Sequence, residues 1–344
     1  MSVEALRNEL DAARSRPNIE LRHIAAIVAE RREPRWLIHK VIERGVLAVL
    51  AGPRSTFKSF VALDWAMRSA VAGHSALILS GEGAGLDRRV DAWMRVHGAS
   101  LSLEDLPVRA IERPLRLCAG GDLAELVEAI SADDFRPALI VIDTLIKYSA
   151  GLDENDNAAM ARYLGDLAVD LRDRFDATVL LVAHSGHGDA KRPRGASALM
   201  ANPDAEFIID RPSPTGMQIT VSRERFKDYA ALEPLAYTGE VIDLGRVDSH
   251  GEPVTSLALH SSQAPPVALK ITGRNMTSAV TALREWCRTR PDARHIATPE
   301  FGELLKAHGI DRRRRLEVIN GLVNLRVLTA AVGGYTIDAK VLTP

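Results

Sequence analysis

From about residue 34 onward, short apolar runs alternate with stretches of helical periodicity. The apolar runs are almost continuous, which is typical of strands buried on both faces of a parallel sheet. They lie at 46–51, 76–79, 138–142 and 178–183. Helical segments separate them, at 60–72, 123–130 and 158–175. This alternation predicts a doubly wound α/β domain with a mainly parallel sheet.

The pattern changes before and after this region. Residues 1–33 are polar and helical in character, with a break near Pro17. After about 205 the chain favours strands, at 207–209, 218–221 and 240–244. The segment 261–270 is polar, contains two adjacent prolines and predicts a linker. We therefore expect an N-terminal helical extension (1–33), an α/β domain (34–260), a linker (261–270) and a small C-terminal domain (271–344).

Three apolar stripes at helical spacing run through the C-terminal domain. They consist of Met276, Val280, Leu283 and Cys287; Phe301, Leu304 and Leu305; and Leu316, Ile319 and Val323. Two apolar segments, 327–332 and 335–337, follow on either side of the turn Gly333-Gly334. Three short helices and a hairpin predict a winged helix-turn-helix domain.

Composition narrows the class of protein. The chain has 344 residues, of which 46% are hydrophobic and 26% charged, as in ordinary globular proteins. No apolar run approaches the roughly 18 residues that span a bilayer, and no apolar signal segment opens the chain. We expect a cytoplasmic protein with no membrane partner. Two cysteines exclude a disulfide scaffold and a four-cysteine zinc site.

Charge is unevenly distributed along the chain. The formal net charge is −1, yet residues 271–344 carry 12 Lys and Arg against 7 Asp and Glu. A basic C-terminal domain on an acidic body indicates nucleic-acid binding through a local patch.

The first apolar run ends in a phosphate-loop motif. The segment reads Gly52-Pro53-Arg54-Ser55-Thr56-Phe57-Lys58-Ser59, and an apolar helix follows from Phe60. In such a loop, backbone N–H groups bind phosphate oxygens, Lys58 reaches the β- and γ-phosphates, and the Ser59 hydroxyl binds Mg²⁺. Phe57 stands where glycine is usual, so its side chain must point away from the phosphates. The motif predicts an ATP site with Mg²⁺; a plain strand-to-helix turn is the alternative.

Polar side chains follow three further predicted strands. Asp143 ends the run 139–143 and would support Mg²⁺. Glu82 follows the strand at 76–79 and could orient the attacking water, although an ordinary loop glutamate is the alternative. His184 ends the run 178–184, where ligands bind to parallel sheets. We expect His184 to be a γ-phosphate sensor or a structural histidine. His184 and His187 do not predict a metal site, because no third ligand stands at a suitable spacing from them.

Arginines mark two more candidate sites. Arg223 and Arg225 alternate on a strand, so we expect them on one face, as arginine fingers for a neighbouring subunit or as a solvated edge. The run 312–315 contains four arginines that cannot share one helix face. Arg312 and Arg313 are candidate DNA contacts, with a solvated helix end as the alternative.

Together these motifs give the segment 36–229 a resemblance to a known family. It resembles the RecA-like P-loop ATPases of the RepA type, an AAA_25-like family that includes plasmid and phage replicative helicases. The matching segments, in order, are Trp36-Leu37-Ile38, the loop with Lys58-Ser59, Glu82 with Leu86 and Arg88-Arg89, Asp143-Thr144-Leu145, Asp153-Glu154-Asn155, His184-Ser185-Gly186-His187, Arg194-Gly195-Ala196-Ser197 with Asp204, and Arg223-Glu224-Arg225.

The resemblance implies a ring, usually hexameric, with ATP between subunits. Glu82 would polarise water, Asp143 would support Mg²⁺, His184 would sense the γ-phosphate, and Arg223 or Arg225 would act across subunits. The segment 193–198 would form a central-channel loop, which makes Arg192 and Arg194 candidate contacts to single-stranded DNA. The resemblance does not cover the C-terminal domain.

The leading hypothesis is therefore an ATP-hydrolysing, replicative-helicase-like motor of a phage, plasmid or mobile element that acts on single-stranded DNA. Its C-terminal domain would bind duplex DNA or a replication protein. The first alternative is a RecA-type ATPase that loads or remodels partners without unwinding. The second is a nucleotide-gated winged-helix regulator with a slow ATP site, which Phe57 favours.

Overall fold

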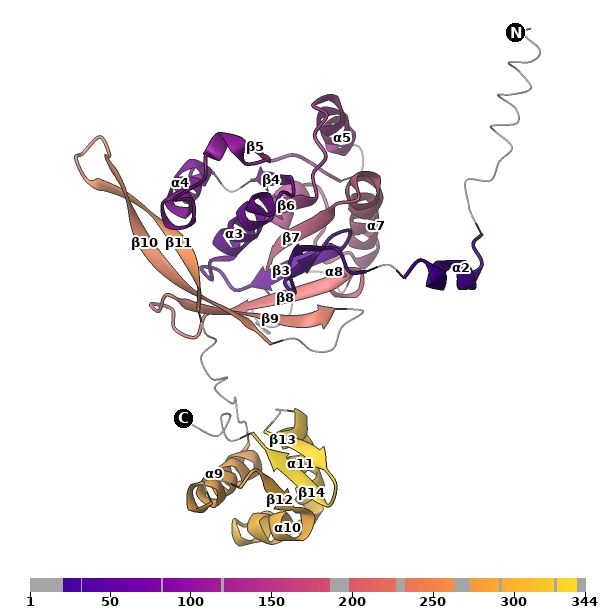
Figure 1. The fold of residues 1–344 in the computed structure, drawn as a ribbon, viewed down its shortest axis with the longest axis vertical. Coiled ribbons are helices and arrows are strands. Elements are labelled where there is room, and N and C mark those ends of the chain that lie inside the picture. The colour runs from indigo at the N-terminus through magenta and orange to yellow at the C-terminus, as the bar shows by residue number, and fades with distance from the viewer. Residues whose placement is uncertain are drawn as a thin grey trace.

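A computed structural model of the chain shows an α/β part built on one large sheet and a smaller set of C-terminal elements (Figure 1). The structure describes residues 21–31, 33–81, 83–118, 121–185, 198–226, 233–262, 273–290, 293–324 and 327–338.

The large sheet has nine strands in the order β11-β10-β9-β8-β3-β7-β6-β4-β5. Its bounds are β3 Leu47–Gly52, β4 Ala76–Ser80, β5 Val108–Ile111, β6 Leu139–Asp143, β7 Thr178–His184, β8 Ala205–Asp210, β9 Gln218–Phe226, β10 Leu235–Val247 and β11 Pro253–Ser262. Neighbours from β8 to β5 pair in parallel, and β8, β9, β10 and β11 pair antiparallel. The predicted mainly parallel sheet is confirmed, and so are the four predicted buried strands.

Helices cover both faces of this sheet. Along β3, Ala48 and Leu50 pack with α3 (Lys58–Val71) and α4 (Leu86–His97), whereas Leu47, Val49 and Ala51 pack on the opposite side. That opposite side is covered by α5 (Leu123–Ala132), α6 (Leu145–Tyr148) and α7 (Asn157–Leu167). Two apolar faces explain why the central strands read as unbroken apolar runs rather than as an alternating pattern.

Several shorter elements were not predicted. They are the edge strand β5, the 3-10 turn Leu103–Asp105 and the small helix α8 (Ala198–Ala201). The predicted helix at 158–175 is present as α7 followed by a π-helical turn over Ala168–Asp173. The antiparallel strands are longer than the patterns at 207–209, 218–221 and 240–244 indicated. The hairpin of β10 and β11 projects from the sheet (Figure 1), and Leu244 and Ala258 of its two strands pack against Ala92 of α4.

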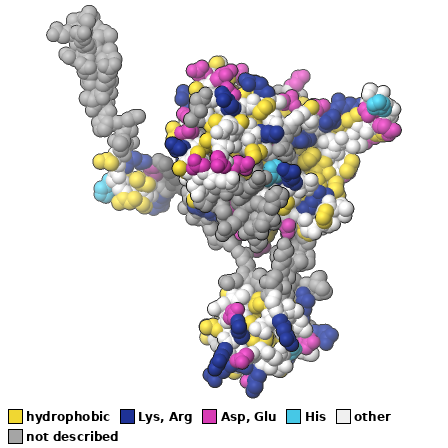
Figure 2. All heavy atoms as spheres, turned by 180° about the vertical axis from the view of Figure 1, so that it is seen from behind, with side chains coloured by type: hydrophobic (Ala, Val, Ile, Leu, Met, Phe, Trp, Pro, Cys, Tyr) yellow, Lys and Arg dark blue, Asp and Glu magenta, His cyan; other side chains and the backbone are white. Residues whose placement is uncertain are grey.

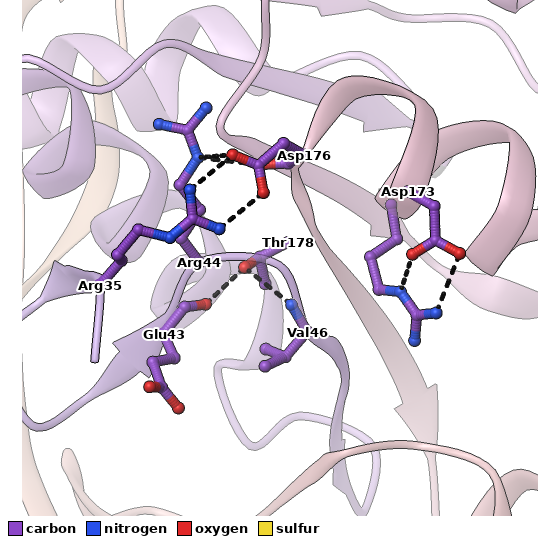
Figure 3. A network of polar contacts seen from close by, with 8 residues as sticks. Arg35, Glu43, Arg44, Val46, Asp173, Asp176 and Thr178 are labelled. Carbon is purple, nitrogen blue, oxygen red and sulfur yellow. Dashed lines mark hydrogen bonds and ion pairs between the residues drawn. The ribbon is translucent and has the colours of Figure 1, made fainter. Parts of the chain in front are cut away.

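The small hairpin of β1 (Trp36–Ile38) and β2 (Ile42–Glu43) is joined to the sheet by the polar network in Figure 3. Arg35 donates two hydrogen bonds to the Asp176 carboxylate, at 2.6 and 2.7 Å, and Arg44 donates to the Asp176 backbone carbonyl. Thr178, the first residue of β7, donates to the Glu43 carbonyl. The network fixes the segment that enters β3 at the amino ends of the strands, opposite the edge that carries the phosphate-loop motif.

The C-terminal elements form a separate core with their own small sheet. They comprise α9 (Arg274–Thr289), β12 (His295–Ala297), α10 (Thr298–Ala307), α11 (Arg312–Asn324), β13 (Leu328–Ala331) and β14 (Gly334–Ile337), with sheet order β12-β14-β13. Phe301 and Leu283 are fully buried in this core. Three helices and a hairpin occur in the predicted order, and β12 is an additional strand that the pattern did not reveal.

Two details of the sequence interpretation are wrong. Leu316 was expected in the apolar stripe of its helix, but it is 68% exposed, and α11 buries Val318 and Leu322 instead. The linker was expected to begin at 261, but Ser261 and Ser262 still pair with β10 as the end of β11. Antiparallel pairing with β10 supplies the hydrogen bonds that keep these two polar residues in the sheet.

Some predictions lie on parts of the chain that the structure does not describe. Residues 1–20 of the predicted N-terminal extension and residues 263–270 of the predicted linker are among them. Within 21–31, one short helix, α2 (Ile24–Ala29), is present, and none of its residues is buried. Among the described helices, none combines the length and the apolar character that crossing a bilayer requires.

Candidate functional site

The carboxyl ends of β3, β7, β6 and β4 bring the predicted polar residues to one edge of the sheet. Gly52 pairs with His184 in the ladder between β3 and β7, and Ser80 pairs with Asp143 in the ladder between β4 and β6. Ser185 N–H donates to the Gly52 carbonyl at 3.0 Å. Because all four strands are parallel, their terminal residues meet where open α/β sheets bind ligands.

The phosphate-loop segment leaves β3 at a position that only glycine fits. A Cβ atom on Gly52 would lie 2.9 Å from the Ile209 carbonyl oxygen and 3.1 Å from Thr56 Oγ1. The Thr56 hydroxyl itself donates to the Pro53 carbonyl at 2.8 Å and closes the loop on itself. The close packing of Gly52 against Ile209 of β8 therefore fixes where the loop leaves the sheet.

Lys58 is the buried charge of the loop. Its side chain is 6% exposed, and Nζ donates to the carbonyl oxygens of Gly52 at 3.0 Å and Pro53 at 2.6 Å. An ammonium group removed from water needs such acceptors, because desolvation penalises its charged form. The lysine thus lies against the mouth of the loop, where it can reach a phosphate bound there.

The first turn of α3 offers backbone donors beside this lysine. Phe57 is the residue that caps the helix, and it makes no side-chain hydrogen bond to the first turn. The N–H groups at the start of the helix, including that of Ser59, are therefore not capped by that side chain. Such N–H groups and the helix dipole favour an anion at this end.

Phe57 occupies a backbone conformation that suits glycine. Its φ is 62° and its ψ is 23°, in the left-handed region, and Ser55 also has a φ of 60°. For a residue with a Cβ atom, this conformation costs roughly 1–2 kcal/mol. The Phe57 ring packs edge-on against Phe60, with ring centroids 6.2 Å apart. The chain therefore keeps the backbone geometry of a glycine-containing loop despite the aromatic residue.

Asp143 ends β6 with its side chain only 5% exposed. Tyr148 lies close enough to this carboxylate to be affected by its charge. Burial is the larger cause and the Asp143 charge the smaller one of a raised pKa for the Tyr148 phenol. Gly81 N–H donates to the Asp143 carbonyl at 2.7 Å, which ties the ends of β4 and β6 together. A carboxylate and the hydroxyl of Ser59 are oxygen ligands of the kind that Mg²⁺ prefers, so the residues present fit the ion.

His184 lies half-buried at the end of β7, beside the first residue of the loop. The predicted water-orienting Glu82 lies outside the described residues. Its neighbour Gly81 is packed so closely that a Cβ atom there would lie 2.9 Å from the Tyr148 ring. The structure thus brings Lys58, Asp143 and His184 to the same sheet edge, and Glu82 follows directly in sequence from a residue of that edge.

The expectation that Arg223 and Arg225 share one face of their strand is wrong. The ladder between β8 and β9 shifts register, so that Arg223 lies opposite Phe207 and Arg225 lies opposite Glu206. Consecutive residues of β8 point to opposite faces, and cross-strand partners share a face. The bulge in β9 therefore sends the two arginines to opposite sides of the sheet.

Both arginines also bind carbonyl groups of their own chain. Arg223 donates to the carbonyls of Lys40 and Glu233, and burial lowers the pKa of its guanidinium. Arg225 donates to the Ala201 carbonyl at 3.2 Å.

The candidate DNA contacts divide into two groups. Arg192 and Arg194 lie outside the described residues. Arg312 and Arg313 are exposed at the start of α11. Figure 2 shows several Lys and Arg side chains on the surface of the C-terminal elements. Within the same run, Arg314 forms an ion pair with Glu317 at 3.0 Å, and Arg315 donates to the Ile310 carbonyl. Arg312, Arg313 and Arg314 are thus all exposed to solvent, whereas Arg315 lies partly buried against the segment that precedes the helix.

One residue near the loop escaped the sequence interpretation. Arg211 follows β8, its Nη1 donates to the Ser55 carbonyl at 2.6 Å, and its guanidinium lies 4.2 Å from the centroid of the Phe57 ring. The contact joins residues 156 positions apart, and no local motif announces it. The only signal available was an arginine two residues after the apolar run 207–209.

The match of the chain to a protein family agrees with this geometry. The AAA_25 family, described as an AAA domain, matches residues 14–190. Among solved structures, that of the RadB recombinase is 16% identical, with 57% of this chain and 87% of that chain covered and a TM-score of 0.41. A second solved structure, an ATPase domain, is 13% identical, with 57% of this chain and 82% of that chain covered and a TM-score of 0.44. No curated protein matches the chain.

Proposed function

On the premise that the chain belongs to the AAA_25 family and is a RecA-like P-loop ATPase, we propose that it is an ATP-hydrolysing motor of the RepA type that acts on single-stranded DNA. The observation that carries the proposal is the shared sheet edge. Gly52, His184 and Asp143 terminate neighbouring strands there, and Lys58 lies buried against the loop between them.

Each residue of this edge has a role in the proposed reaction. The loop 52–59 and Phe60 at the start of α3 would hold the phosphates, with Lys58 on the β- and γ-phosphates. Ser59 and Asp143 would hold Mg²⁺, which neutralises charge on the phosphates when bound. His184 would sense the γ-phosphate, and Glu82 would orient the attacking water.

An assembly of copies, usually a hexamer in proteins of this type, would complete the site. An arginine from a neighbouring copy would stabilise the charge that develops on the transferred phosphoryl group. Of the two candidates, we favour Arg225, because Arg223 is held between two backbone carbonyls and is partly buried. Arg192 and Arg194 would contact single-stranded DNA in the channel of the ring.

The C-terminal elements suggest a second contact with DNA or with a replication protein. Three helices with a three-stranded sheet are the composition of a winged helix, and α11 presents exposed Arg312 and Arg313. We propose that residues 271–344 form a winged-helix domain that docks duplex DNA through these arginines, joined to the motor domain 34–260. A loader or remodeller that does not unwind DNA would use the same two parts.

Steady-state ATP hydrolysis, with and without single-stranded and duplex DNA, tests the motor. We expect turnover that single strands stimulate and that Lys58→Ala abolishes, whereas Lys306→Ala, an exposed lysine that pairs with Glu303, keeps it. Turnover that persists in Lys58→Ala would refute the site.

A mixing experiment tests the role across subunits. Arg225→Ala should remove turnover and retain nucleotide binding, and mixing it with Lys58→Ala should restore activity in mixed assemblies. Arg223→Ala is the control from the other face of β9. If mixing restores nothing, Arg225 does not act across subunits.

A nucleotide-gated regulator is the second candidate, and the residue type of Phe57 favours it, because a bulky side chain stands where the loop usually has glycine. The regulator predicts ATP binding without turnover and a preference for duplex over single-stranded DNA. For duplex binding, each lost phosphate contact should reduce the slope of log K against log salt by about 1. Arg312→Ala with Arg313→Ala should show this loss, and Arg314→Ala, whose partner is Glu317, should not.

A further inference from the structure

Arg211 makes three contacts, two of them with the phosphate loop and one with the turn between β8 and β9. Its Nη1 donates to the Ser55 carbonyl at 2.6 Å, and its Nε donates to the Gly216 carbonyl at 2.8 Å. Its guanidinium carbon lies 4.2 Å from the centroid of the Phe57 ring. The side chain therefore bridges the turn between β8 and β9 and two residues of the loop 52–59.

The backbone of Arg211 is fixed where this bridge needs it. β8 pairs in parallel with β3, so Arg211 leaves the sheet at the same edge as the loop. The Ile209 carbonyl lies so close to Gly52 that a Cβ atom would approach it to 2.9 Å. On the other side, Gly216 N–H is held by the Ser213 carbonyl at 3.1 Å, which closes the turn that anchors Nε.

The loop residues that Arg211 contacts are those with left-handed backbones. Ser55 and Phe57 have φ values of 60° and 62°, a conformation that side chains with a Cβ atom disfavour. A charge-assisted hydrogen bond holds the carbonyl of the first, and a cation–π contact holds the ring of the second. Arg211 therefore contacts the two loop residues, Ser55 and Phe57, whose backbone conformation is unfavourable.

We propose that Arg211 is a positioning residue that holds the loop 52–59 in its phosphate-binding conformation and makes Phe57 tolerable in place of glycine. The proposal rests on the proposed ATP function, because the conformation matters only if the loop binds phosphates. Arg211 and Phe57 act as one unit: the residue whose Cβ atom is disfavoured in the left-handed conformation also provides the ring that the guanidinium contacts.

Two other roles for Arg211 make different predictions. If Arg211 merely stabilised the fold, its removal would lower the unfolding temperature and leave nucleotide affinity unchanged. If it bound a phosphate directly, its loss would weaken binding whatever residue stood at position 57. A positioning role acts through the loop, so its effect depends on Phe57.

The first experiment measures ADP affinity and nucleotide-free thermal unfolding on the full chain. We expect Arg211→Ala to raise the dissociation constant for ADP about tenfold, as the loss of one charge-assisted hydrogen bond and one cation–π contact would. Arg211→Lys, which keeps the charge but cannot bridge both carbonyls, should recover only part of the affinity. The matched control is Arg95→Ala, which removes a 2.6 Å bond to the Leu244 carbonyl far along the sheet and should leave ADP affinity unchanged.

The second experiment repeats the comparison in a Phe57→Gly background. With glycine at 57, neither the strain at that position nor the cation–π contact remains, and Arg211 supplies only the hydrogen bond to the Ser55 carbonyl. Arg211→Ala should then raise the dissociation constant for ADP by only about threefold, as the loss of one hydrogen bond would. A full tenfold loss in both backgrounds, or no loss in either, would overturn the proposal. If the unsubstituted chain binds no ADP at all, the proposed ATP function fails instead, and the two failures are thereby distinct.

Discussion

Replacing Phe57 by glycine and, separately, by alanine tests the left-handed backbone at the heart of the loop. Both variants lose the ring contacts with Arg211 and Phe60 equally, so the difference between them isolates the backbone. With φ at 62°, alanine retains a cost of roughly 1–2 kcal/mol that glycine avoids. Glycine loses about 0.5–1 kcal/mol of this advantage through its freedom in the unfolded chain. We expect the glycine variant to be more stable by about 0.5–1 kcal/mol.

The assay is urea unfolding of the α/β part, followed by tryptophan fluorescence in a Trp286→Phe background, in which Trp36, Trp65 and Trp93 all report on that part. An ordinary helical position supplies the control: Ala129→Gly on the exposed face of α5 should destabilise by about 1 kcal/mol. An alanine variant at 57 that is as stable as the glycine variant, or more so, would refute the left-handed geometry and with it the reason for the Arg211 contact.

Three further outcomes follow from other parts of the molecule. Gly52→Ala places a Cβ atom 2.9 Å from the Ile209 carbonyl, so ADP affinity measured by titration should fall at least about tenfold; unchanged affinity would contradict the close approach. Arg35 holds the pKa of Asp176 below its usual range, so the carboxylate stabilises the fold above about pH 4 and loses that effect as pH falls through the lowered pKa. The stability difference from Asp176→Asn should be at most about 1 kcal/mol for this half-exposed pair and should shrink as pH falls through the lowered pKa of Asp176; a difference that grows in acid would contradict this sign. Phe301→Ala should destabilise the C-terminal core by about 3–5 kcal/mol, measured by hydrogen exchange, without changing ADP affinity, unless the two parts fold as one.

The sequence predicted well the buried strands, the loop motif and the polar strand ends, because each depends on a short contiguous segment. Strands covered on both faces must be apolar throughout, so the runs around Leu50 and Leu180 revealed a parallel sheet. The loop motif is contiguous, and a polar residue at the end of a buried strand needs only that strand's boundary to be placed. Asp143 and His184 were therefore found at the correct edge.

The errors lie where a partner strand or a neighbouring element decides the outcome. A bulge is a mismatch between two strands, so the strand that carries Arg223 and Arg225 could not by itself reveal that they diverge. Leu316 follows an apolar spacing, but the way α11 packs against its neighbours turns Val318 inward instead.

The α/β class, the phosphate-loop motif and the acidic strand end each depend on residues adjacent in the chain, so the sequence is enough to predict them. The strand order that brings β8 against β3, and with it the contact of Arg211 with Ser55 and Phe57, arises only when the whole domain is folded. That contact joins residues 156 positions apart in the chain, and hydrophobic periodicity does not show which distant segments will lie side by side. The physical reason is that periodicity reports how a segment is buried, whereas the partner that buries it is chosen by packing across the whole domain.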